Sequence, residues 1–237
     1  MKNLIVVLVV LLFGTFFITG CAHIPQVAQQ PLAEQKQADL GFFYRDGTIN
    51  WDVQAQPIDM IVVHHSALDS DVTWVKISNL QRVTLYKPRY ESPDTNPYLT
   101  GEPHSGHFRP VDGEWREVFY AYHWYIRPSG ECERWLLDRE VGWQAGNWNV
   151  NCRSIAICFA GDYSQGKPTE EALDASASLI AGYIKKFPAI KLETNVIGHR
   201  EVNKKTICPG NEFLGPDGWK QVLVKKVQVL LVKEKGG

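Results

Sequence analysis

Three short apolar runs, rich in β-branched residues, constrain the fold of this chain most strongly. They lie at residues 58–63, 154–160 and 195–198. Apolar runs of this length are typical of buried strands, and the segments between them are long enough to hold helices. The order of these elements predicts an α/β domain in which helices flank a central mixed β-sheet in three layers.

Three helices are predicted around these strands. The clearest begins at Thr169, a capping residue followed by two glutamates that suit the helix dipole. Its apolar residues recur at helical spacing as far as Phe187. A second helix is expected over residues 69–86, closed by Pro88, and a third over about 217–232.

Two further segments complete the expected domain, which extends over residues 46–237. Residues 119–127 and 131–137 are predicted to pair as a hairpin around a Pro-Ser-Gly turn. Residues 88–118 are rich in Pro, Gly, Asn and Asp, and we expect them to form a long irregular insertion. Loops of that length inside compact domains are usually functional or disordered.

Residues 1–20 have the pattern of a secretory signal peptide. Lys2 supplies positive charge, and residues 4–18 are almost entirely apolar but shorter than the roughly 20 residues that span a membrane. Residues 18–21 read Ile-Thr-Gly-Cys and resemble a bacterial lipobox, which predicts cleavage before Cys21 and acylation of that residue. The alternatives are an uncleaved anchor helix and simple secretion.

Residues 21–45 are expected to form the lipidated N-terminus and a flexible tether, because they are rich in Gln, Ala and Pro and lack an apolar period. The non-acidic Ala22 after the cysteine favours, by resemblance to lipoproteins of Gram-negative bacteria, the periplasmic face of the outer membrane. The formal net charge of −1 indicates no strong attraction to nucleic acid. We expect the domain to be a monomer.

The cysteines have different expected roles. Cys158 lies within an apolar run and is predicted to be a small buried hydrophobic residue. Cys132 and Cys152 either form a disulfide, in a compartment that permits one, or remain free thiols, and their spacing does not decide between the two.

A pair of residues near the C-terminal third suggests a metal site. His199 follows a predicted strand, and Cys208 comes nine residues later on a loop that Pro209 fixes and Gly210 loosens. Zinc takes nitrogen and sulfur ligands, and its catalytic sites use three protein ligands and leave a fourth position open. A lone histidine at a strand end is, however, more often a hydrogen-bonded structural residue.

The wider pattern resembles the type 2 N-acetylmuramoyl-L-alanine amidase family, which includes phage T7-type lysozyme and the peptidoglycan recognition proteins. The matching segments occur in order at 63–67 (VHHSA), 121–124 (AYHW), 151–161, 198–202 (GHREV) and 206–211 (TICPGN). The resemblance extends from about residue 51 to 219 and implies the fold expected above. It also implies zinc-dependent hydrolysis of the amide bond between N-acetylmuramic acid and L-alanine in peptidoglycan or muropeptides.

Residue by residue, the resemblance implies that His64, His199 and Cys208 bind Zn²⁺. It implies catalytic roles for Tyr122 and Thr206. It further implies that the stretch before the apolar run at 154–160 borders the substrate groove, with Trp143, Gln144 and Asn147 as substrate-binding residues. Some relatives place a catalytic Glu on the strand that here reads Ile-Cys-Phe at 157–159, so this chain lacks that carboxylate.

Several alternatives stay open at the level of sequence. One is a peptidoglycan-recognition module of the same fold that binds without cutting. Another is a structural zinc site, which would need a fourth ligand such as Cys158 or His65. His104 and His107 either form a second metal site or, as we expect, lie exposed on a loop, and His123 is expected in the core or behind the metal ligands.

Overall fold

The computed structural model describes residues 51–91 and 102–233. The predicted signal peptide, the lipidation site at Cys21 and the tether therefore lie outside the described residues. In the described part of the chain, no helix is both long and apolar enough to cross a membrane.

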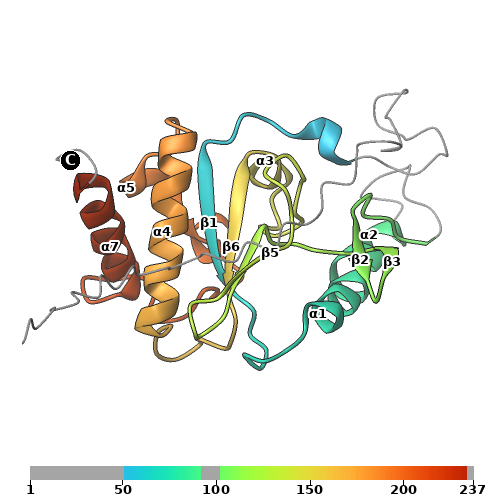
Figure 1. Ribbon diagram of the computed structural model, residues 1–237, viewed down its shortest axis with the longest axis horizontal. Coiled ribbons are helices and arrows are strands. Elements are labelled where there is room, and N and C mark those ends of the chain that lie inside the picture. The colour runs from blue at the N-terminus through green and yellow to red at the C-terminus, as the bar shows by residue number, and fades with distance from the viewer. Residues whose placement is uncertain (1–50, 92–101, 234–237) are drawn as a thin grey trace, which may run out of the picture.

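A five-stranded mixed sheet forms the centre of the domain (Figure 1). Its strands follow the order β5 (Cys132–Arg134), β4 (Trp124–Ile126), β6 (Ser154–Phe159), β1 (Met60–His65) and β7 (Val196–Gly198). β4, β6, β1 and β7 run parallel, and β5 pairs antiparallel with β4. The predicted mixed sheet and three-layer α/β class are confirmed.

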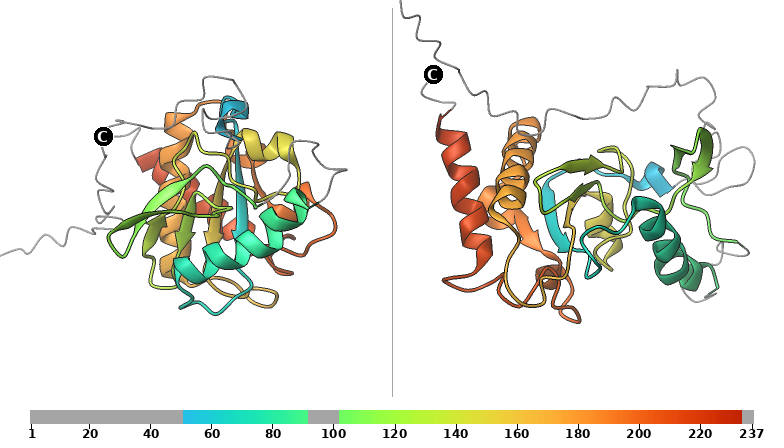
Figure 2. Two further views of the ribbon diagram at one scale, coloured as in Figure 1. Left: turned by 90° about the vertical axis from the view of Figure 1, so that its right-hand side faces the viewer. Right: turned by 60° about the horizontal axis from the view of Figure 1, so that its bottom comes forward.

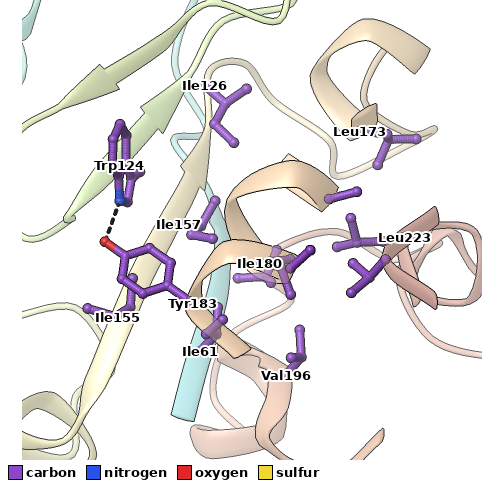
Figure 3. Close-up of a cluster of buried hydrophobic side chains, with 14 of the residues drawn as sticks. Ile61, Trp124, Ile126, Ile155, Ile157, Leu173, Ile180, Tyr183, Val196 and Leu223 are labelled. Carbon is purple, nitrogen blue, oxygen red and sulfur yellow. Dashed lines mark hydrogen bonds between the residues drawn. The ribbon is translucent and has the colours of Figure 1, made fainter. Parts of the chain in front are cut away.

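Helices α4 (Glu170–Lys186) and α7 (Trp219–Lys233) cover one face of the sheet (Figures 1 and 2). The Thr169 hydroxyl accepts a hydrogen bond from the backbone N–H of Ala172, so the predicted cap is confirmed. Isoleucine side chains from β1, β4 and β6 pack against the apolar stripe of α4 (Figure 3). Trp124 Nε1 donates to the Tyr183 hydroxyl at 2.8 Å, which satisfies a buried polar pair inside this core.

The opposite face carries α1 (Trp74–Gln81), η2 (Arg82–Tyr86), α2 (Lys87–Tyr90) and, nearer the strand ends, η1 (Trp51–Gln54) and α3 (Trp148–Cys152). Here both ends of the predicted helix were wrong: it begins at Trp74, capped by Thr73, instead of at residue 69, and Pro88 does not end it. The π-helical turn η2 precedes Pro88, which then occupies the first turn of α2. A missing N–H costs little in that turn, so the helix continues past the proline.

The predicted insertion at 88–118 is only partly irregular: residues 102–107 contain no helix or strand, but the segment that follows them is ordered as strands. β2 (Phe108–Val111) and β3 (Glu114–Glu117) form a separate two-stranded sheet. The Asp112-Gly113 turn that joins them has positive φ at both residues, 52° and 82°. This is the conformation that Asp-Gly favours in the two-residue loops of hairpins. The Asp112-Gly113 pair could therefore have predicted this hairpin from the sequence.

The predicted hairpin at 119–137 is shorter than expected. Residues 119–122 run beside α1 instead of pairing as a strand. Helix side chains bond to their backbone: the N–H groups of Phe119 and Ala121 donate to Ser78 Oγ and Gln81 Oε1, each at 2.9 Å. Cys132 and Cys152 are both free thiols, so the structure contains no disulfide between them.

Candidate metal centre and adjoining pocket

Three residues predicted to bind metal converge at one edge of the sheet. His64 lies near the C-terminal end of β1, His199 opens α6 (His199–Val202) directly after β7, and Cys208 lies on the following loop. Because β1 and β7 are parallel with Val63 opposite Gly198, the two histidines leave the sheet side by side. One ligand atom from each of the three residues lies within 4.8 Å of the others.

The geometry of these atoms fits a zinc ion. Cys208 Sγ lies 3.6 Å from His64 Nδ1. Tetrahedral zinc with Zn–S of about 2.3 Å and Zn–N of about 2.05 Å would put the two ligand atoms about 3.6 Å apart. His199 Nε2 is buried and has no hydrogen-bond partner within the protein. Since buried polar atoms are nearly always paired, a metal is the natural partner for this nitrogen.

Backbone contacts hold the Cys208 loop against the sheet. The N–H of His65 donates to Cys208 Sγ at 3.4 Å, and the N–H of Arg200 donates to the Cys208 carbonyl at 2.7 Å. Gly210 was expected to loosen this loop, but it has a different role. A Cβ at this position would lie 2.0 Å from the Tyr163 carbonyl oxygen, so only glycine allows the loop to pack this closely.

Burial sets the protonation states of the ligand side chains. It lowers the pKa of His64 well below 6.5, with a further contribution from His199, and it lowers the pKa of His199. Both imidazoles are therefore neutral near pH 7, as metal ligands must be. Burial also raises the pKa of the Cys208 thiol to about 12, so a cation is needed to stabilise its thiolate.

The two residues predicted to be catalytic lie close to this group. The Tyr122 ring centroid is 5.1 Å from that of His64, and its hydroxyl contacts the Cys158 thiol. Burial and the nearby Cys158 and Cys208 thiols hold the pKa of Tyr122 well above 10, so the hydroxyl keeps its proton. The Thr206 hydroxyl accepts from the Cys208 N–H at 3.1 Å and stabilises the turn before the cysteine.

Neither residue considered as a fourth ligand belongs to the group of converging atoms. His65 points to the other side of β1, where its Nδ1 accepts from the Tyr163 N–H at 2.9 Å. Cys158 lies opposite His64 in the register of β1 and β6 and packs against α1. His123 is buried in the core, where it bonds to backbone groups of Glu140 and Ala156.

A cavity of about 440 Å³ opens beside His199. Of the three predicted groove residues, Trp143 and Gln144 line it, whereas Asn147 caps α3 by accepting from the Val150 N–H. The same stretch also contributes Gly146, Trp148 and Asn151 to the lining. Sequence reasoning missed the lining residues that come from segments distant in sequence, which are Trp51, Leu85, Arg89 and Asn203. Trp51 and Trp148 contact Trp143 edge to face, so three indole rings form one wall.

A buried charge network lies behind this wall. His107 Nε2 lies 3.1 Å from Asp52 Oδ1, and Arg109 pairs with Glu140. The expectation that His107 is an exposed loop residue was wrong, because only 2% of it is exposed. Asp52, His107 and Glu140 could also hold a metal by proximity, but Arg109 already neutralises Glu140. We therefore interpret this cluster as a structural ion network.

The network predicts a pH-dependent contribution to stability. Despite burial, Glu140 and Asp52 raise the pKa of His107 above 6.5. A raised folded-state pKa contributes stability that is complete below pH 6.5 and is lost as pH rises through the folded pKa. We expect His107→Gln to destabilise the domain more at about pH 6 than at about pH 9. Urea unfolding with chelator present measures the free energy of unfolding of wild type and variant at each pH. Equal losses of this free energy at the two pH values would contradict the prediction.

Comparison with known proteins completes the description of the site. The sequence model of a family described as N-acetylmuramoyl-L-alanine amidase matches residues 54–211, a range that includes the three converging ligands and Tyr122. No curated protein sequence gives a significant match.

Two solved amidase structures share the fold at low sequence identity. The amidase LysC from Clostridium intestinale is 22% identical with a TM-score of 0.51, covering 76% of this chain and 89% of that one. The endolysin amidase LysCS from the same organism is 23% identical with a TM-score of 0.50, covering 74% and 86%. Drosophila peptidoglycan recognition protein SD is 22% identical with a TM-score of 0.40, covering 70% and 91%.

Proposed function

Because this chain belongs to the N-acetylmuramoyl-L-alanine amidase family, we propose that it hydrolyses the amide bond between N-acetylmuramic acid and L-alanine, with zinc held by His64, His199 and Cys208. The substrate would be peptidoglycan or soluble muropeptides. The observation that carries the proposal is the convergence of three ligand atoms within 4.8 Å, beside a cavity that His199 lines.

The ligand set supports a catalytic metal more than a structural one. Structural zinc sites are usually closed by four protein ligands, whereas three protein ligands leave a position for chemistry. When bound, the metal would polarise the amide carbonyl and lower the pKa of a water molecule to roughly 7.

The remaining chemistry falls to side chains next to the ligands. Tyr122 keeps its hydroxyl proton at neutral pH, so it can donate a hydrogen bond to the oxyanion that develops on the carbonyl oxygen. Thr206 is a weak base, and its hydroxyl already accepts from the Cys208 N–H. We therefore assign Thr206 to holding the Cys208 turn and orienting water or the leaving amine.

The competing function is a recognition module of the same fold that binds peptidoglycan without cutting it. A module of that kind needs the groove but not the metal ligands or the Tyr122 donor. The presence of all four residues favours catalysis.

A digest of purified peptidoglycan distinguishes the two. Mass spectrometry of the products should reveal stem peptides with a free L-alanine amine and glycan strands that keep their lactyl groups. Binding to peptidoglycan without release of such peptides would favour the recognition module, and cuts at a glycosidic or peptide bond would exclude the proposed reaction.

We also propose that Cys21 is lipidated and anchors the domain at the cell envelope, on the periplasmic face of the outer membrane. Residues 4–21 support this proposal by their apolar run and lipobox-like end. Two or more acyl chains are needed for stable anchoring, because each buried CH₂ contributes roughly 0.8 kcal/mol. The tether would let the domain reach the wall.

Replacing the proposed lipidation site gives a direct test. We expect Cys21→Ala to move the full-length protein from the membrane fraction to the soluble fraction or to block its processing. Immunoblots of fractionated cells measure this, with Cys132→Ala as the matched control. Unchanged membrane association of Cys21→Ala would argue against the lipid anchor.

A further inference from the structure

Two consecutive residues, Gln144 and Ala145, contact the two histidines of the proposed metal centre from behind. Gln144 Oε1 lies 2.6 Å from His64 Nε2. His199 hydrogen-bonds the backbone of Ala145, and its Nε2 has no protein partner. In each ring, therefore, one nitrogen is held by this segment and the other is left for the metal side.

A chain of hydrogen bonds determines which way the Gln144 amide faces. The Ser154 hydroxyl donates its only proton to the Val150 carbonyl at 2.6 Å. It must therefore accept from Gln144 Nε2, which lies 2.9 Å away. The amide oxygen then faces His64, so Nε2 of His64 is the protonated nitrogen. The lone pair of His64 lies on Nδ1, the atom 3.6 Å from Cys208 Sγ.

The segment that carries these contacts is itself rigidly held. The Ala145 N–H donates to Asn151 Oδ1 at 2.9 Å. Gly142 packs so tightly that a Cβ would lie 2.2 Å from the Ala121 carbonyl oxygen. Between them, the Trp143 ring stacks on Tyr86 at a centroid distance of 4.4 Å. A segment fixed at both ends can hold both imidazole rings in one orientation.

We propose that Gln144 is a positioning residue for the metal, which orients His64 and selects its tautomer through the Ser154–Gln144–His64 chain, while the Ala145 backbone does the same for His199. This inference rests on the proposed zinc site and assigns Gln144 a role other than the substrate contact implied by the resemblance. Hydrogen-bond partners of metal-binding histidines typically change metal affinity by about 10- to 100-fold when removed.

Three substitutions test this role by zinc affinity, measured by competition with a chromophoric chelator on purified protein. Gln144→Met keeps the volume but removes the acceptor, and we expect zinc to bind about 10- to 100-fold more weakly. Gln144→Glu restores an acceptor for His64, and we expect affinity within about threefold of wild type. Ser154→Ala frees the amide to rotate and should weaken zinc binding severalfold. Gln221→Met, on an exposed position of α7, is the matched control.

The outcomes separate this role from its rivals. Wild-type affinity in Gln144→Met together with a raised KM would overturn the inference and assign Gln144 to the substrate. Equal losses in Gln144→Met and Gln144→Glu would also overturn it, because packing alone would then explain the effect. If Gln144→Met does not fold, unchanged affinity in Ser154→Ala overturns it. Absence of zinc binding by the wild type would instead reject the proposed function.

Discussion

Cys208→Ala is expected to remove zinc binding and amidase activity together while the domain stays folded. The thiolate is the only anionic ligand of the proposed site, and two neutral imidazoles on their own hold zinc weakly. A Lewis-acid metal lowers the activation free energy by several kcal/mol, and each 1.36 kcal/mol changes the rate about tenfold. Activity should therefore fall by on the order of a thousandfold or more. Zinc content by elemental analysis and the rate of muropeptide cleavage measure the two effects.

The control for this substitution is Cys152→Ala, which removes a buried free thiol that does not belong to the converging ligands. We expect it to keep zinc and activity. Circular dichroism must show that Cys208→Ala is folded, as expected for the loss of a single sulfur atom from a loop side chain. A folded Cys208→Ala protein with one zinc per chain would contradict the ligand assignment.

Tyr122→Phe is expected to slow turnover by about 10²- to 10³-fold while zinc content stays unchanged. The phenol is lost but the ring that packs near His64 remains, so the metal ligands keep their surroundings. The hydrogen bond strengthens only as charge develops on the oxyanion, so the loss should fall on kcat more than on KM.

A matched control uses a nearby tyrosine on the other side of the sheet edge. The Tyr163 hydroxyl donates to the Ala160 carbonyl at 3.0 Å, and Tyr163→Phe should leave turnover unchanged. Wild-type kcat in Tyr122→Phe would remove Tyr122 from the mechanism. Loss of zinc from Tyr122→Phe would show a role in building the site instead.

Those parts of the fold that depend on local pattern were predictable from the sequence. The strand before His64 and the strand before His199 are short apolar runs, and parallel strands bring their C-terminal ends to one edge. Thr169 and the stripe that follows it identify α4 in the same way. The three proposed ligands could be named because a family-wide pattern connects segments that no local rule connects.

The surroundings of the site were not predictable, because they depend on contacts between distant segments. The bond from Gln144 to His64 joins residues 80 positions apart, and no periodicity signals it. The π-helical turn that lets the helix pass Pro88 brings Arg89 to the cavity wall, and it has no simple sequence signature. His107 was placed wrongly because its burial depends on Asp52, at the start of the domain.

The most direct test of the central claim is a zinc titration of metal-free protein. Increasing zinc is added to chelator-treated domain, and release of stem peptide with a free L-alanine amine is followed by mass spectrometry. We expect no product without metal, a linear rise, and a plateau at about one zinc per chain, as three ligands around one ion require. The same product at full rate without metal, or no product at any zinc concentration, would contradict a zinc amidase.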